Sequence, residues 1–511
     1  MKLLIIPLWA AIGACSSSIP APQPGEIRHV LMISLDTTRA DHLGAYGDTR
    51  GLTPHLDSLA ARSVRFDDAM SPAPTTLAAH TSILTGSYPQ THGVARNGFV
   101  VHPDNVTLPE ILQAMGWRTG AVIGSFALES RFGLDQGFEV FDENFTMGTH
   151  GEGSQRPADA RRLRDQNQRN ARQVTDAALE QIDRVGDAAS FHFVHYFDPH
   201  VPYEAPAAFV QAHAAPGAGK GANDWDIERQ VGALQAPILG KGVGLAAVIK
   251  QGLIPKLLEG ASGEAGAADL ALASLYATEV AYLDSQVGRL ITGLDARGLL
   301  ENTLVVLTGD HGETFWEHGD FWNHGLMLHQ TTVHVPLMLA FPDGRGAGRV
   351  VAGPVSTVDV LPTVAEVLGL DLPERAEGIS LVSAIDGGLL PQRALFSVAT
   401  QPYTQEPKDG RWRNIFKPQA VRMGPWKYVR TPYMNGYEQL FHLGRDPGEQ
   451  HNLCRLPLDA ETGAALKLLR QQLQRFSEDV AALPSEFHTA AETSRKLESL
   501  GYVQGGGNEQ D

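Results

Sequence analysis

The strongest constraint on the fold is a set of five near-continuous apolar runs, three of which end in Asp. Runs of this kind are typical of strands that are buried on both faces of a parallel sheet. Helical patterns lie between them, for example YATEVAYLDSQVGRLITGL at 276–294. This alternation predicts an α/β fold with a doubly wound, mostly parallel sheet. The five runs are HVLMISLD (29–36), TGAVIGSFA (119–127), SFHFVHYFD (190–198), NTLVVLTGD (302–310) and VHVPLMLAF (333–341).

Length and composition indicate a large folded domain with a smaller companion. The 511 residues exceed one core of ordinary size, and 43% of them are hydrophobic. We expect a main domain over 28–390, with a Gly/Ala-rich insertion at about 205–270, and a C-terminal α+β subdomain and tail over 391–511. The insertion is either a cap over a site or a low-complexity loop. A net charge of −17 without a Lys/Arg cluster argues against nucleic acid as a partner.

The N-terminus has the pattern of a secretion signal. Residues 1–14 contain a Lys and an apolar run too short to span a bilayer, and small residues precede Cys15. The stretch IGAC at 12–15 resembles the lipobox of bacterial lipoproteins, in which the Cys is lipidated. We therefore expect a signal peptide at 1–14, a lipidated Cys15 with a tether over 15–27, and membrane anchoring in the bacterial cell envelope, at the outer membrane facing periplasm or exterior. Cys454 would then be the only other cysteine, which excludes an intramolecular disulfide.

Acidic residues at strand ends are the first indication of a site. Ligands of doubly wound sheets bind beyond the carboxyl ends of the strands, where Asp36, Asp198 and Asp310 are expected. In VVLTGDHGE, His311 follows Asp310 directly, and a carboxylate beside an imidazole at a strand end is a candidate metal-ligand pair. A solvated loop with incidental charge is the alternative.

A second motif, SPAPTTLAAHTSILTGSYPQTHG at 71–93, joins a Pro-rich turn to a helical stretch that starts at about Thr76. A hydroxyl at a helix start lies close to free backbone N–H groups and to the positive end of the helix dipole, which suits an anionic ester. Alternatively, Thr75 or Thr76 is only an N-cap. The motif by itself leaves these two interpretations open.

Together, SLDTTRADHLGAYG, the Thr76 segment and VVLTGDHGE resemble the signatures of the sulfatase family within the alkaline phosphatase superfamily. Thr76, ten residues before Gly86, matches the family's nucleophile position. The resemblance covers about 28–455 and implies an alkaline phosphatase/sulfatase-like sheet. It continues through FGLDQGFEVFD, YFDPHVPY, TEVAYLDSQVG, DHGETFWEHG, HVPLML, STVDVLPTVAEVLG, DGRWRNIFKPQAVRMGPWKYVRTP and LFHLGRDPGEQHNL.

The departures from the family pattern concern the chemistry. Sulfatases oxidise a Cys or Ser nucleophile to formylglycine, and Thr76 cannot undergo this conversion. His80 replaces the pattern's Arg, Ser125 its Lys, and Thr37 a frequent second Asp. The chain thus resembles a Thr-nucleophile, non-formylglycine subgroup that includes phosphodiesterases. This implies a metal-dependent hydrolase of sulfuric or phosphoric esters, favouring phosphate or phosphonate esters.

The resemblance also implies a ligand set and catalytic residues. Asp36, Asp310 and His311, with the Thr76 hydroxyl, would bind one divalent metal ion, which could be Ca²⁺, Mg²⁺ or Mn²⁺, with Zn²⁺ admissible. Asp198 with His200 is the nearest candidate for a second metal. His80, on the same helix face as Thr76, would contact an ester oxygen or move a proton, or would only pack the helix.

His200 and His324 are the expected substrate-contacting residues, one of which would protonate the leaving group. Lys427 and Arg39 could bind an anion, although structural roles are favoured for both. Two other functions stay open: a transferase that moves a phospho-group onto envelope glycan or lipid, and a catalytically lapsed protein that binds anions or glycans. The expected partners are an ester substrate, which could be part of a glycan or lipid, and the membrane through Cys15.

Overall fold

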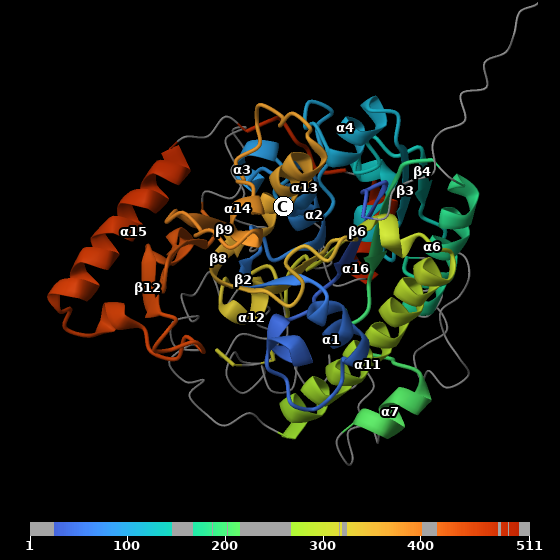
Figure 1. Ribbon diagram of the computed structural model, residues 1–511. Helices are drawn as coiled ribbons and strands as arrows, with labels where there is room; N and C mark the ends of the chain where they lie inside the picture. Colours follow the sequence, from blue (N-terminus) through green and yellow to red (C-terminus); the bar gives the residue numbers. More distant parts are fainter. Residues whose placement is uncertain are drawn as a thin grey trace, which may run out of the picture.

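Figure 1 shows the computed structural model, which describes residues 25–145, 167–186, 188–201, 203–214, 267–315, 317–318, 324–400, 416–478, 482–488 and 490–499. The predicted signal peptide and Cys15 lie outside these residues, so the lipoprotein assignment stays a prediction. Most of the predicted insertion also lies outside them, apart from helix α7 (Ala207–His213) and the start of α11 (Ala267–Ala296). Within the described part of the chain, no helix is long and apolar enough to cross a bilayer.

An eight-stranded sheet forms the centre of the protein, in the order β4-β3-β5-β1-β6-β7-β2-β8. Strand β1 lies between β5 and β6 and is parallel to both. Strand β7, which contains the run HVPLML, is antiparallel to both of its neighbours. The strands are β1 (His29–Leu35), β2 (Val64–Met70), β3 (Arg118–Val122), β4 (Val140–Asp142), β5 (Ser190–Tyr196), β6 (Thr303–Gly309), β7 (His334–Ala340) and β8 (Val350–Ser356).

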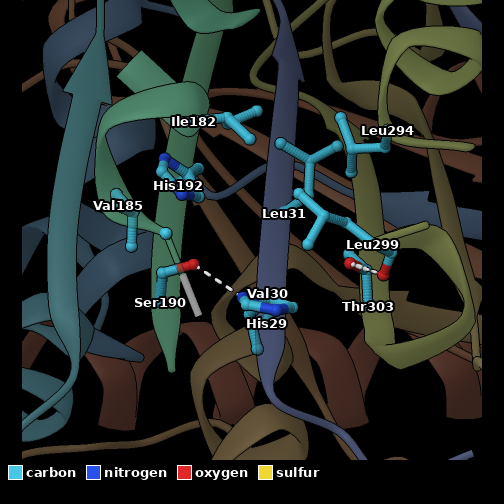
Figure 2. Close-up of a pocket in the computed structure, with 11 residues that line it drawn as sticks. His29, Val30, Leu31, Ile182, Val185, Ser190, His192, Leu294, Leu299 and Thr303 are labelled. Carbon is cyan, nitrogen blue, oxygen red and sulfur yellow. Dashed lines mark hydrogen bonds between the residues drawn. The ribbon is translucent and has the colours of Figure 1, made fainter. Parts of the chain in front are cut away.

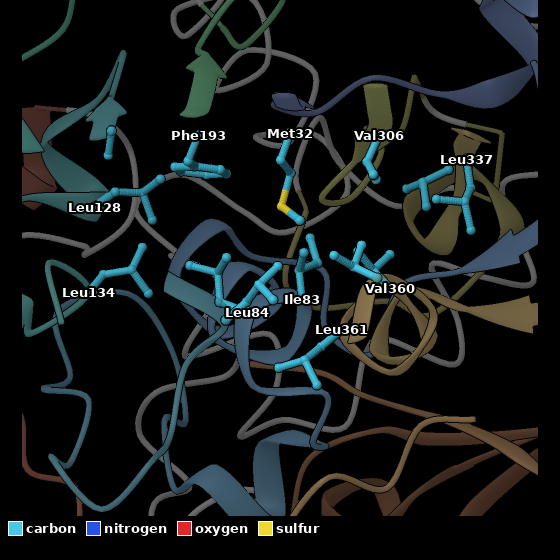
Figure 3. Packing of buried hydrophobic residues seen from close by; sticks show 14 of the residues in the cluster. Met32, Ile83, Leu84, Leu128, Leu134, Phe193, Val306, Leu337, Val360 and Leu361 are labelled. Atoms are coloured by element: carbon cyan, nitrogen blue, oxygen red, sulfur yellow. The ribbon is translucent and has the colours of Figure 1, made fainter. Parts of the chain in front are cut away.

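Helices cover both faces of this sheet, because alternate side chains of a buried strand point to opposite faces. Met32 of β1 joins one core with Ile83 and Leu84 of a covering helix (Figure 3). Ile33, the next residue, joins the core on the other face. The first core includes residues of α2 (Thr76–Thr85), α4 (Leu108–Ala114) and α13 (Val360–Leu368), and the second includes residues of α1 (Pro54–Ala61), α6 (Ala171–Val185) and α11. This layered arrangement confirms the predicted doubly wound, mostly parallel α/β fold.

A second, four-stranded antiparallel sheet follows, in the order β12-β11-β10-β9. Helix α15 (Ala460–Glu478) packs on it through Leu466, Leu469 and Leu473. The predicted smaller α+β unit is therefore present. Its strands are β9 (Leu395–Val398), β10 (Gln419–Met423), β11 (Trp426–Thr431) and β12 (Tyr437–His442). The other α-helices among the described residues are α3 (Pro89–His92), α12 (Gln330–Val333), α14 (Val382–Ile385) and α16 (Ala491–Ser499).

A small pocket lies at the amino-terminal ends of β1, β5 and β6. His29, Ser190 and His192 line it together with aliphatic side chains (Figure 2). His29 Nδ1 is 2.8 Å from Ser190 Oγ. The pocket has room for about one water molecule, so it is too small for an ester substrate. It also lies at the end of the strands opposite to the acidic residues predicted to form the site.

Candidate active site

The candidate site begins where β1 and β6 end side by side. Their parallel register pairs Leu35 with Gly309, so the next residues of the two strands, Asp36 and Asp310, come together. Both carboxylates are fully buried. The predicted location beyond the carboxyl ends of central parallel strands therefore holds for both residues, although they are 274 positions apart in the sequence.

Asp36, Asp310 and His311 form a group whose ligand atoms all lie within 4.8 Å of one another. His311 Nε2 is 3.4 Å from Asp310 Oδ2 and 3.9 Å from Asp36 Oδ1. These three atoms are buried and have no hydrogen-bond partner. Within the described residues this is the only such group of three or more His, Cys, Asp or Glu side chains, and Asp198 and His200 are not part of it. The suggested second-metal pair of Asp198 and His200 stays a prediction.

The remaining polar atoms of these side chains are already engaged in a way that suits metal binding. Asp310 Oδ1 accepts the backbone N–H groups of Thr37 at 3.1 Å and of His311 at 2.7 Å. His311 Nδ1 lies 2.9 Å from the carbonyl oxygen of Gly312, so Nδ1 carries the proton and Nε2 presents its lone pair. Two carboxylate oxygens and one imidazole nitrogen therefore converge with their lone pairs unused, and the donor set fits a divalent cation.

The electrostatics of the two carboxylates also favour a cation at this position. Burial raises the pKa of Asp36 to about 7, although His311 and a hydrogen bond from Thr76 lower it in part. Burial and the charge of Asp36 also raise the pKa of Asp310. Two buried carboxylates at this distance are unfavourable when both are ionised, and a cation between them relieves this cost.

Thr76 completes the group. It is the first residue of α2, follows the N-cap residue Thr75, and is fully buried. Its hydroxyl hydrogen-bonds the carboxylate of Asp36. The structure thus brings together all four residues of the predicted ligand set, and Thr76 is not a side-chain N-cap, since α2 has no such capping bond.

Asn97 is a residue of the site that sequence reasoning missed. Its Oδ1 accepts the backbone N–H of Leu77, the residue after Thr76, at 2.7 Å. Its Nδ2 is buried and has no hydrogen-bond partner, and the same holds for the hydroxyl of Thr75. Two unused donors therefore lie at the first turn of α2, next to Thr76.

His80 has the predicted position on α2, with Nδ1 3.6 Å from Asp310 Oδ2, but both of its ring nitrogens already have hydrogen-bond partners. Nδ1 lies 2.7 Å from the carbonyl oxygen of Thr76, and Nε2 lies 2.7 Å from the hydroxyl of Ser34. Burial lowers the pKa of His80 to about 3, so the ring is neutral. Contact with an ester oxygen or proton transfer would require breaking one of these bonds. The arrangement therefore favours the helix-packing alternative.

His200 and His324 lie close to the metal-ligand group. The ring of His324 stacks on that of His311, with centroids 4.5 Å apart, and contacts the ring of His200 at 5.1 Å. His200 Nδ1 lies 2.6 Å from the carbonyl oxygen of Val201, and His324 Nδ1 lies 3.1 Å from Glu313 Oε2. Each ring is thus held through Nδ1, beside the metal-ligand group.

Lys427 and Arg39, by contrast, are paired with carboxylates. Lys427 Nζ lies 2.7 Å from Glu449 Oε1, and both side chains are fully buried. The Arg39 guanidinium contacts Asp41 at 2.7 Å and also pairs with Glu317. These contacts agree with the structural roles favoured for both cations.

His195 is a second residue that sequence reasoning missed. It lies near the end of β5, opposite Ser34 of β1, and its Nε2 is 3.1 Å from Asp36 Oδ2. Burial lowers the pKa of His195 to about 4. The only signal in the sequence is that a polar residue interrupts an apolar strand close to an acidic strand end, which does not distinguish His195 from His192 of the same run.

Comparisons with known proteins agree with this fold. The family model described as Sulfatase matches residues 28–370, more than half of the chain. The chain is 25% identical over 444 residues to the ulvan-active sulfatase of Formosa agariphila. This alignment covers 84% of this chain and 77% of that protein.

Two solved structures share the fold. One is a protein in complex with its substrate D-glucosamine-2-N,6-O-disulfate, with a TM-score of 0.65 and 20% identity over 88% of this chain and 97% of that chain. The other is the phosphonate monoester hydrolase of Agrobacterium radiobacter, with a TM-score of 0.63 and 21% identity over 88% of this chain and 95% of that chain. From the family match and from the strand-end site, we conclude that this chain belongs to the sulfatase family of ester hydrolases.

Proposed function

We propose that this protein is a metal-dependent hydrolase of sulfuric or phosphoric esters that uses the Thr76 hydroxyl as its nucleophile. The observation that carries the proposal is the position of Thr76. Its hydroxyl is buried at the start of α2 and hydrogen-bonds the carboxylate of Asp36, which forms a group with Asp310 and His311. A Thr that served only to cap the helix would have no reason to bond a candidate metal ligand.

A divalent metal would be held by Asp36 Oδ1, Asp310 Oδ2, His311 Nε2 and the hydroxyl oxygen of Thr76. When bound, it would supply positive charge that lowers the pKa of the hydroxyl and stabilises charge on the ester oxygens. Three oxygens and one nitrogen suit Mn²⁺, Mg²⁺ or Ca²⁺ and admit Zn²⁺.

The reaction has two steps, the formation of a covalent Thr76 ester and its hydrolysis. In the first step, the Thr76 oxygen forms a bond to the phosphorus or sulfur of the ester, and the bond to the departing alcohol breaks. Asn97 Nδ2, at the first turn of α2, donates to an ester oxygen on which charge develops. The hydroxyl proton of Thr76 is lost to solvent as its oxygen attacks, and His200 or His324, in its doubly protonated imidazolium form, gives the alcohol its proton. In the second step, water hydrolyses the Thr76 ester.

The nucleophile decides between substrate classes. The second step of a formylglycine sulfatase expels sulfate by re-forming an aldehyde, and a Thr ester has no such route. A Thr76 adduct must instead be hydrolysed at phosphorus or sulfur, as in the phosphodiesterases that the chain resembles. This supports phosphate and phosphonate esters as the preferred substrates, and a phosphonate monoester hydrolase is among the proteins that share the fold.

The proposal is tested by turnover of four p-nitrophenyl esters (sulfate, phosphate, phosphate diester and phenylphosphonate) with Mn²⁺, Ca²⁺ or Zn²⁺. Thr76→Ala should lower turnover of the preferred ester on the order of a thousandfold or more, because the nucleophile is removed. Thr81→Ala is the matched control. Thr81 is a buried Thr on the same helix whose hydroxyl bonds the carbonyl oxygen of Leu77 at 2.7 Å, and its loss should leave turnover nearly unchanged.

Other outcomes would favour other functions. Equal turnover by Thr76→Ala and the wild type would refute the nucleophile assignment. No turnover of any ester, combined with a protein that purifies without stoichiometric metal, would favour a lapsed binding protein. Release of p-nitrophenol that accelerates with added alcohol, with the group recovered on the alcohol, would favour the transferase.

A further inference from the structure

The tautomer of His195 follows from its two hydrogen bonds. The backbone N–H of Gly124 donates to His195 Nδ1 over 3.2 Å, so Nδ1 is an acceptor and carries no proton. In the neutral ring the proton is then on Nε2. Because Nε2 lies 3.1 Å from Asp36 Oδ2, His195 donates a hydrogen bond to this carboxylate.

The ring of His195 is also fixed in orientation. The side chain is fully buried. It stacks nearly parallel to Phe193, at 13° and a centroid distance of 6.5 Å, and it meets the ring of His80 edge-on at 4.9 Å. A donor that cannot turn specifies which oxygen of Asp36 is engaged. Oδ2 is taken by His195, whereas Oδ1 has no hydrogen-bond partner and faces His311 Nε2 at 3.9 Å.

This control over Asp36 matters because the site has few carboxylates. Thr37 stands where the family pattern often has a second Asp, and its hydroxyl is buried without a partner. Its backbone instead binds Asp310 through the N–H group, at a φ of 48°. Asp36 and Asp310 are therefore the two anionic members of the metal-ligand group, and the affinity depends on how each one presents its oxygen.

We propose that His195 is a positioning residue that donates from Nε2 to Asp36 Oδ2 and thereby presents Oδ1 as the metal-binding oxygen. The inference rests on the metal site of the proposed function. It adds a residue outside the ligand set and assigns the two oxygens of Asp36 different tasks.

The test measures binding of Mn²⁺ to the metal-free full chain by titration calorimetry, without any ester. His195→Leu removes the donor at similar volume and should weaken Mn²⁺ binding by about 10- to 100-fold. His195→Gln places an amide N–H near the position of Nε2 and should recover most of this loss. His192→Leu is the control, because His192 is a buried imidazole on the same strand, in the pocket of Figure 2, away from the metal-ligand group.

Unchanged Mn²⁺ affinity in His195→Leu would overturn the proposal, and so would an equal loss in His195→Gln and His195→Leu. If His195→Leu does not fold, the tautomer of His195 in the metal-free wild type decides, read from its imidazole ¹⁵N resonances. A proton on Nδ1 would overturn the proposal, and a proton on Nε2 would support it. If the His195 variants change the Mn²⁺ affinity as expected but the wild type hydrolyses no ester, only the proposed function is refuted. A wild type that binds no Mn²⁺, Ca²⁺, Mg²⁺ or Zn²⁺ would refute both the proposed function and the role of His195.

Discussion

The raised pKa of Asp36 makes metal binding to this protein depend on pH in a predictable direction. A metal needs the ionised carboxylate, and the pKa of Asp36 in the metal-free protein is about 7. At pH 8 the carboxylate is therefore about 90% ionised, and at pH 6 about 10%. One proton must be released for each metal bound below pH 7, so the affinity for Mn²⁺ should fall about tenfold from pH 8 to pH 6. Because burial and Asp36 also raise the pKa of Asp310, the fall can be steeper but not shallower.

Titration calorimetry with Mn²⁺ at pH 6, 7 and 8 measures this dependence. Repeating it in buffers with different ionisation enthalpies counts the released protons, which should be about one at pH 6 and fall towards zero at pH 8. Asp284→Asn is the control: this buried carboxylate, with a pKa raised to about 6, accepts the backbone N–H groups of His55 and Leu56 outside the metal-ligand group. That variant should keep the pH dependence of the wild type. An Mn²⁺ affinity that is equal at pH 6 and pH 8 would refute the argument from Asp36.

Three further predictions concern single side chains. Asn97→Ala should lower kcat/KM on the preferred p-nitrophenyl ester by about 100-fold, through loss of a donor to the developing charge, with little change in Mn²⁺ affinity. Lys427→Met leaves the buried Glu449 without its cation and should lower the free energy of unfolding by about 3–5 kcal/mol, measured by urea denaturation. Ile83→Ala empties part of the core beneath α2 and should lower the free energy of unfolding by about 2–5 kcal/mol. A loss below about 0.5 kcal/mol would contradict the packing in Figure 3.

The fold and the positions of Asp36 and Asp310 at strand ends could be predicted because they follow from local patterns. A continuous apolar run identifies a strand buried on both faces, and its end identifies where a polar side chain becomes available. Neither inference requires knowing which strands are neighbours. The adjacency of Asp36 and Asp310 follows only from the pairing of β1 with β6, which the structure supplies. The family resemblance is what joined them with Thr76 in advance.

His195 and Asn97 could not be found in this way, because their tasks depend on contacts between distant segments. Asn97 contacts Leu77 at the start of α2, which is 20 positions away in the sequence. His195 contacts Asp36, which is 159 positions away in the sequence. His80 illustrates the opposite difficulty. Helical spacing placed it correctly next to Thr76, but spacing says nothing about Ser34, which engages its Nε2. Sequence patterns therefore locate a side chain more reliably than they indicate which of its atoms remain available.

The residues that replace the Arg and the Lys of the family pattern influence which esters fit this site. His80, at the position of the Arg, is neutral with both nitrogens engaged, and Ser125, at the position of the Lys, uses its hydroxyl to accept the N–H of Ala127 at 3.2 Å. Two positive charges of the pattern are thus absent at these positions, while Asn97 offers a neutral donor. A phosphate monoester carries close to two negative charges at pH 8, whereas a phosphate diester or phosphonate monoester carries one. The phosphate diester and the phosphonate monoester should therefore have a higher kcat/KM than the phosphate monoester in the four-ester panel, and a preference for the phosphate monoester would mean that other cations of the protein reach the substrate.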